Sequence, residues 1–292
     1  MVRQGLSVIA ALTMLIVAAP GMAAEEPVVR VYNWTEYIDE TVLPDFTQLT
    51  GIKVVYETFD TNDVLESKLL AGGAGYDLVF PGDNFLSRQV QAGVFAKLDK
   101  SKIPNWKNLD PQMMQRAARF DPGNAYAAIY LWGTTGIAYN EQMIKERMAD
   151  APVDSWRMIF DPNVVKRFAD CGVYMLDAAD EIVPTALNYI GEEPDSKDYK
   201  VIAKAEPVLA AVRPYIRGFH TSEDIIAALA DGDICLAVTW SGDAGMAATR
   251  AKEPGKPYDV VYVIPYDKEG AEMFLDMMAI PKDAPHPETR TP

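Results

Sequence analysis

The sequence predicts an α/β protein with two lobes joined by a hinge. Apolar runs typical of strands alternate with segments of helical spacing, as a parallel sheet requires. Roughly 270 residues follow an amino-terminal leader, which is enough for two α/β lobes or for one large domain. A β-rich run at 127–140 carries Gly-Thr-Thr-Gly at its centre, which favours a strand that passes between two lobes.

Residues 1–24 have the pattern of a secretory signal peptide. Arg3 supplies a positive region, an apolar run at 8–19 is short for a membrane span, and Ala23 and Ala24 suit signal peptidase. No later stretch approaches the length of a transmembrane helix. We therefore expect an exported protein whose leader is cleaved.

The first lobe is expected to begin with a right-handed βαβαβ unit, because three strand-like runs are separated by two helical segments. Gly51 and Gly72 end the two helices. The predicted elements are a strand at 28–31, a helix at 39–50, a strand at 52–56, a helix at 64–71, a strand at 76–80 and a helix at 85–92.

The second lobe is expected to follow the run at 127–140. Its predicted elements are strands at 173–176 and 236–240, helices at 180–190, 201–212 and 222–230, and an Ala-rich segment at 244–248. The chain then returns to the first lobe, with strands at 258–264 and 273–280. We therefore assign 25–132 and 253–292 to lobe 1 and 133–252 to lobe 2.

Acidic residues outnumber basic ones, and the formal net charge is −15. Loss of Arg3 with the leader makes the charge one unit more negative. Such a surface repels nucleic acid and suits cationic ligands, although acidity for solubility alone explains the same composition. Two cysteines and two histidines, His220 and His286, lack the spacing of a zinc site, so we expect neither a metal nor a cofactor.

Cys171 and Cys235 each lie beside an apolar, strand-like run. In an oxidising compartment two such thiols can pair, and closing so long a loop stabilises a fold by roughly 4 kcal/mol on the chain-entropy model. Two buried free thiols are the alternative.

Aromatic residues stand where predicted strands end. Trp34 and Tyr37 follow the first strand, and Trp240 ends the strand at 236–240. Phe274 lies instead near the start of the last strand. The carboxyl ends of strands in an open α/β sheet are where ligands bind. Ordinary core packing is the alternative for each single ring.

Carboxylates occupy similar positions. Asp83 and Asn84 follow the third strand, and Asp243 follows Trp240 by three residues; capping a helix is the alternative role for all three. Asp276 interrupts an apolar strand, where a buried carboxylate without a partner costs several kcal/mol. Either a nearby Arg or Lys or a bound cation must pair with it.

Aromatic walls combined with carboxylates indicate an aliphatic diamine or polyamine, because rings pack on methylene groups and attract ammonium groups. Mg²⁺ or Ca²⁺ would want oxygen ligands without aromatic walls. A sugar site would carry more Asn, Gln and Arg donors. We find no nucleotide-binding glycine motif, no nucleophile elbow and no cleft histidine, so we do not expect an enzyme.

These residues also resemble a known family, the periplasmic polyamine-binding proteins of ABC transporters, most closely those for putrescine and spermidine. The resemblance runs from about Val28 to Pro281. Its motifs include Tyr-Asn-Trp-Thr-Glu-Tyr-Ile, Thr-Thr-Gly-Ile-Ala-Tyr-Asn, Trp-Ser-Gly-Asp and Phe-Leu-Asp-Met. It implies a two-lobe, type II-like periplasmic-binding fold and a monomer that delivers a polyamine to ABC permease subunits in the inner membrane. A polyamine sensor that feeds a signalling partner is the alternative.

The resemblance also implies roles for individual residues. Trp34, Tyr37, Trp240 and Phe274 match the family's aromatic box, and Asp243 and Asp276 match its amine-binding carboxylates. The remaining matches are Thr35, Glu36 and Glu181, where the family varies residues to tune polyamine length, Ser222 as a minor contact, and Cys171 and Cys235 as a disulfide.

Two features depart from the family pattern. Gly82, Asp83 and Asn84 replace a serine-rich turn, which adds a carboxylate near one amine and leaves the choice of polyamine open. Family members also continue beyond the position of Pro292 with further elements, so we expect the carboxyl-terminal part of the fold to be missing here.

Overall fold

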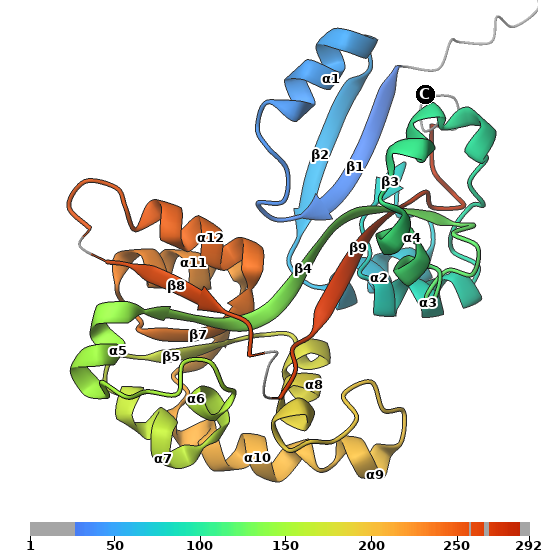
Figure 1. Cartoon of the computed structure of the whole chain (residues 1–292). Coiled ribbons are helices and arrows are strands. Elements are labelled where there is room, and N and C mark those ends of the chain that lie inside the picture. The colour runs from blue at the N-terminus through green and yellow to red at the C-terminus, as the bar shows by residue number, and fades with distance from the viewer. Residues whose placement is uncertain (1–26, 257, 266–268, 287–292) are drawn as a thin grey trace, which may run out of the picture.

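The computed structural model describes residues 27–256, 258–265 and 269–286, and the predicted signal peptide lies outside them. In this part of the chain, strands and helices form two lobes connected by long strands, so the predicted α/β class is confirmed (Figure 1). The strands follow the order β2-β1-β3-β9-β4-β7-β5-β6, and β8 pairs with β4.

The first lobe is built on β1 (Val28–Trp34), which lies parallel to β2 (Lys53–Phe59) and β3 (Leu78–Val79). The strand β9 (Met273–Ala279) joins β3 in the antiparallel direction. Helices of this lobe are α1 (Val42–Thr50), α2 (Asn62–Ala71), α3 (Asp83–Gln91) and α4 (Pro111–Ala117), with 3-10 turns at Lys100–Lys102 and Pro104–Asn108.

The second lobe holds the larger core. In it β5 (Val173–Leu176) lies between the parallel strands β6 (Gly218–His220) and β7 (Leu236–Trp240). The fully buried Trp156, Phe160 and Phe168 belong to this core. Its helices are α5 (Glu141–Arg147), α6 (Arg157–Phe160), α7 (Pro162–Val165), α8 (Ala179–Tyr189), α9 (Tyr199–Ile202), α10 (Ala205–Val212), α11 (Ser222–Asp231) and α12 (Ser241–Arg250), with 3-10 turns at Lys166–Phe168 and Arg213–Tyr215.

A single strand, β4 (Ala127–Asn140), passes from one lobe to the other, as the sequence predicts (Figure 1). Residues 127–134 pair with β9, and residues 135–139 pair with β7. Close packing accounts for both glycines of this strand: a Cβ at Gly133 would lie 2.5 Å from the ring of Phe274, and one at Gly136 would lie 2.6 Å from the hydroxyl of Tyr262.

The strand β8 (Val260–Val263) belongs to the second sheet, because it pairs with Ile137–Asn140 of β4. The sequence-based assignment counted residues from 253 onward with the first lobe. In the structure β8 pairs with the 137–140 half of β4, whereas β9, which begins at Met273, pairs with the 127–134 half.

Cys171 and Cys235 form a disulfide, which confirms the pairing implied by the resemblance. Val173 pairs with Leu236 in parallel register, so the residues just before β5 and β7 lie side by side. The Cα atoms of the two cysteines are 5.5 Å apart, and the two residues are 64 positions apart along the chain.

The helix expected at 201–212 is two helices, α9 and α10, which are separated by Ala203 and Lys204. Among the helices of residues 27–286 that the structure describes, none has the length and apolar character to cross a membrane.

Candidate ligand-binding cleft

A cavity of about 290 Å³ lies between the two lobes. It is bounded by the loops that follow the carboxyl ends of β1, β2, β3, β5 and β7, where ligands bind in open α/β sheets. Every predicted site residue lines it: Trp34, Thr35, Glu36, Tyr37, Asp83, Asn84, Glu181, Ser222, Trp240, Asp243, Phe274 and Asp276.

Three rings form an aromatic wall. The indole N–H of Trp34 donates to the carbonyl of Phe80 at 2.9 Å, which fixes the orientation of the ring. The ring centroids of Trp34 and Trp240 are 5.8 Å apart and those of Trp240 and Phe274 are 6.1 Å apart, both in edge-to-face geometry. Since both lobes supply rings, a ligand held against this wall contacts both.

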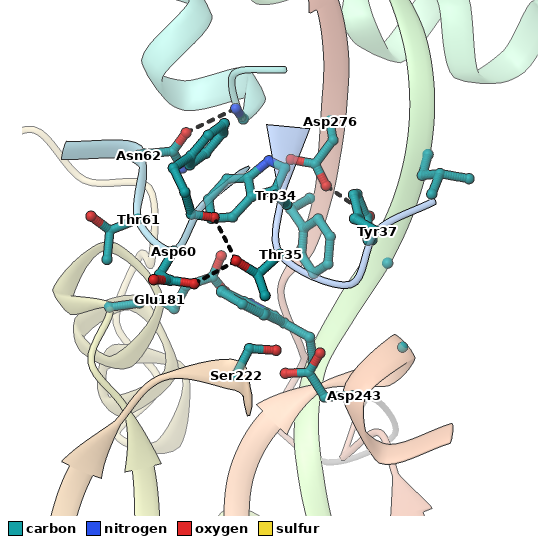
Figure 2. A pocket seen from close by; sticks show the side chains of 18 of the residues that line it. Trp34, Thr35, Tyr37, Asp60, Thr61, Asn62, Glu181, Ser222, Asp243 and Asp276 are labelled. Atoms are coloured by element: carbon teal, nitrogen blue, oxygen red, sulfur yellow. Dashed lines mark hydrogen bonds between the residues drawn. The ribbon is translucent and has the colours of Figure 1, made fainter. Parts of the chain in front are cut away.

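Asp276 faces the cleft because of strand alternation. Along β9, Phe274 and Asp276 point into the cavity, whereas Leu275 between them is fully buried in the core. The Tyr37 hydroxyl donates to Asp276 Oδ2 at 2.9 Å (Figure 2). No ion pair in the described part of the chain involves this carboxylate, so a cationic ligand could supply its missing partner.

Asp83 is a second buried carboxylate of the first lobe and is only 4% exposed. Its oxygens accept the backbone N–H groups of Asn84 at 2.7 Å and Leu275 at 3.2 Å. Gly82 occupies the N-cap position of α3, so the alternative that Asp83 or Asn84 caps this helix is wrong. The side chain of Asp83 instead links α3 to β9, because it accepts one backbone N–H from each.

The second lobe contributes Glu181 and Asp243. The Thr135 hydroxyl donates to Glu181, and the Thr239 hydroxyl donates to Asp243 Oδ2 at 3.0 Å. Trp240 is the N-cap residue of α12, so Asp243 does not cap that helix.

Ser222 is the first residue of α11 and not its cap, because Thr221 occupies the N-cap position. Its side chain lies beside Asp243 at the edge of the cleft (Figure 2).

Burial raises the pKa of all four carboxyl groups. The pKa of Asp83 and of Asp243 rises to about 6. The pKa of Glu181 rises to about 7 and that of Asp276 to about 8, and repulsion from neighbouring carboxylates adds to the effect of burial. A cation in the cleft would favour the ionised form of each group.

The described residues that line the cavity include no Lys, Arg or His. Glu36 is the lining carboxylate with an ion-pair partner: its Oε2 lies 2.6 Å from Nη2 of Arg250, on α12 of the other lobe. Glu36 adopts a positive φ of 55°, which is uncommon for this residue type. Thr35 also makes a protein contact, since its hydroxyl donates to Asp60 Oδ1 at 2.7 Å.

Sequence reasoning missed several lining residues, including Asp60, Asn62, Trp132 and Asp180. Asp60 and Asn62 follow the carboxyl end of β2. The rule that selected the residues after β1 and β3, a position at the carboxyl end of a strand, would also have selected these two. Trp132 directly precedes Gly133 and is 55% exposed, but its ring type alone predicts core packing. Among the described residues, no group of three or more His, Cys, Asp or Glu side chains could hold a metal ion.

Comparison with known proteins shows the same family along the whole chain. Residues 41–291 match the family model described as bacterial extracellular solute-binding protein. The putrescine-binding periplasmic protein SpuD of Pseudomonas aeruginosa is 47% identical over 289 residues, which are 99% of this chain and 78% of the relative. The putrescine-binding periplasmic protein PotF of Escherichia coli is 46% identical over 284 residues, which are 97% of this chain and 76% of the relative.

A solved structure is similar as well. A spermidine/putrescine ABC transporter protein from Listeria monocytogenes has a TM-score of 0.77 and 34% identity to this chain, and the match covers 91% of this chain and 76% of that one. The sequence family and the two-lobe architecture therefore agree.

Proposed function

The chain belongs to the bacterial extracellular solute-binding proteins, and from this premise we propose that it captures a polyamine between its lobes and delivers it to an ABC permease. Like its relatives, it is a binding protein and not an enzyme. The names of those relatives, which mention putrescine or spermidine, support this class of ligand. Nothing in the structure or the comparisons favours a signalling role.

The observation that carries the proposal is a cleft with four buried carboxylates, an aromatic wall and, among the described residues, no cationic side chain. Desolvating a carboxylate is costly unless a positive charge pairs with it. An ammonium group supplies that charge and donates charge-assisted hydrogen bonds, while a methylene chain packs on the rings. An aliphatic polyamine has both parts in one molecule.

The two lobes would close around the ligand by rotation about the crossing strands. We place the lobe limits at Gly133 on β4 and at Met273 on β9, where the chain passes between the two sheets. A ligand that contacts both lobes favours the closed form by its differential affinity for the two states. The closed form would bind the permease subunits as a monomer.

Residues 1–24 would direct export and be removed. The periplasm, where the relatives act, is the compartment that fits both this leader and the Cys171–Cys235 disulfide.

Isothermal titration with putrescine, spermidine and a neutral sugar tests the proposal. We expect heat of binding with at least one amine and none with the sugar. The Ser222→Ala variant serves as a control, because it leaves the four carboxylates intact and should bind the amine nearly as well as the parent. A folded chain that binds the sugar and neither amine would contradict the proposal.

A further inference from the structure

The carboxylates of the cleft are divided unequally between its two ends. Asp276 and Asp243 lie on opposite sides of the Trp34 indole in the view of Figure 2. Asp83 belongs to the Asp276 end, because it accepts the N–H of Leu275 and because Gly82 and Asp276 form an antiparallel bridge.

The electrostatics of the cleft agree with this division. Burial first, and then the charges of Asp83 and Glu181, raise the pKa of Asp276. At the opposite end Glu36 is the carboxylate that adds to the effect of burial on the pKa of Asp243. Asp83 and Asp276 therefore lie together at one end, which we call the acid-rich end, whereas Asp243 stands beside a glutamate already paired with Arg250.

A single ammonium group cannot satisfy the acid-rich end. An ionised carboxylate has about four acceptor positions, so Asp83 and Asp276 together offer about eight. The hydrogen bonds described above occupy about three of these positions: two at Asp83 and one at Asp276. A primary ammonium has only three N–H donors and one charge, so several acceptors and one of the two negative charges would remain without a partner.

We propose that the cleft selects an aliphatic triamine, with two neighbouring amino groups at the acid-rich end and the third amino group at Asp243. Asp83 is the specificity-determining residue, since its carboxylate brings the acid-rich end beyond what one ammonium can neutralise. This inference rests on the proposed function, because it identifies the ligand of the same cleft.

Titration calorimetry with spermidine, a triamine, and putrescine, a diamine, tests the proposal. We expect the parent protein to bind spermidine at least about tenfold more tightly than putrescine. The Asp83→Asn variant should lose about tenfold or more in spermidine affinity and less than about threefold in putrescine affinity, because the remaining Asp276 carboxylate can be neutralised by one ammonium group. Asp150→Asn makes the same carboxyl-to-amide change at an exposed residue that does not line the cavity, and it is the matched control.

A measurement on the parent protein alone keeps the test independent of how the variant folds. Spermidine acetylated at its aminopropyl nitrogen carries one charge fewer, and we expect it to bind about tenfold or more weakly than spermidine. Equal affinity of the acetylated and free amines, or tighter binding of putrescine than of spermidine, would overturn the triamine proposal and leave the polyamine function intact. A folded parent that binds none of these amines would instead overturn the polyamine function.

Discussion

Replacement of Asp276 by Asn is expected to stabilise the empty protein while it removes a ligand contact. Asp276 is 5% exposed, and burial with repulsion from Asp83 raises its pKa from 3.8 to about 8. At pH 7 the folded protein must therefore keep a proton on a group that is ionised in the unfolded chain. Since pH 7 lies about three units above the unfolded-state pKa of 3.8 and each unit corresponds to 1.36 kcal/mol, keeping this proton costs about 4 kcal/mol of stability.

Asparagine needs no proton and can still accept the hydrogen bond from Tyr37, so we expect Asp276→Asn to raise the free energy of unfolding by about 2–4 kcal/mol at pH 7. The sign of the pH dependence follows from the raised pKa. Between about pH 4 and pH 8 the folded protein binds more protons than the unfolded chain, so the free energy of unfolding of the parent falls as pH rises. In the variant it should fall less.

Urea unfolding at pH 5, 6, 7 and 8, followed by tryptophan fluorescence in the absence of amines, measures both effects. The exposed Asp150→Asn change is the control and should give a pH profile parallel to that of the parent. An Asp276→Asn variant that is no more stable than the parent at pH 7, with the same pH dependence, would refute the reasoning.

Three further changes test other parts of the structure. Asp243→Asn should weaken amine binding about 100-fold or more in calorimetry, since breaking a buried charge pair costs about 3–5 kcal/mol; an unchanged affinity would rule out an amine contact there. Glu36→Gln removes the partly exposed bridge to Arg250, so affinity should fall about two- to fivefold at low salt and less at high salt, and a salt-independent loss would argue against the bridge. Serine at both Cys171 and Cys235 should lower the free energy of unfolding in urea by about 2–5 kcal/mol, and stability equal to the parent would show that the disulfide contributes nothing.

The position of the cleft could be predicted from the sequence because topology determines it. Trp34 and Trp240 each end a buried strand, and the carboxyl ends of these strands converge on one cavity. Asp276 was recognisable as a polar residue in an apolar strand, and alternation along the strand accounts for its direction. The structure places both features in the same cavity.

Other features depend on contacts that no local pattern encodes. The apolar run of β8 predicts a strand, but only its pairing with residues 137–140 shows which sheet it joins. The bridge between Glu36 and Arg250 joins residues 214 positions apart. Residue type alone also does not fix a helix cap: Asp243 is a good capping residue by type, yet Trp240 holds the N-cap position of α12.

A crystal structure of this chain with putrescine or spermidine is the most direct test of the central claim, that buried carboxylates and aromatic rings hold a polyamine between the lobes. We expect one ammonium nitrogen within about 2.7–2.9 Å of Asp276 and another at a similar distance from Asp243, with the methylene chain against Trp34 and Trp240. An amine bound outside the cleft, or a cleft in which these carboxylates make no contact with the bound amine, would contradict it.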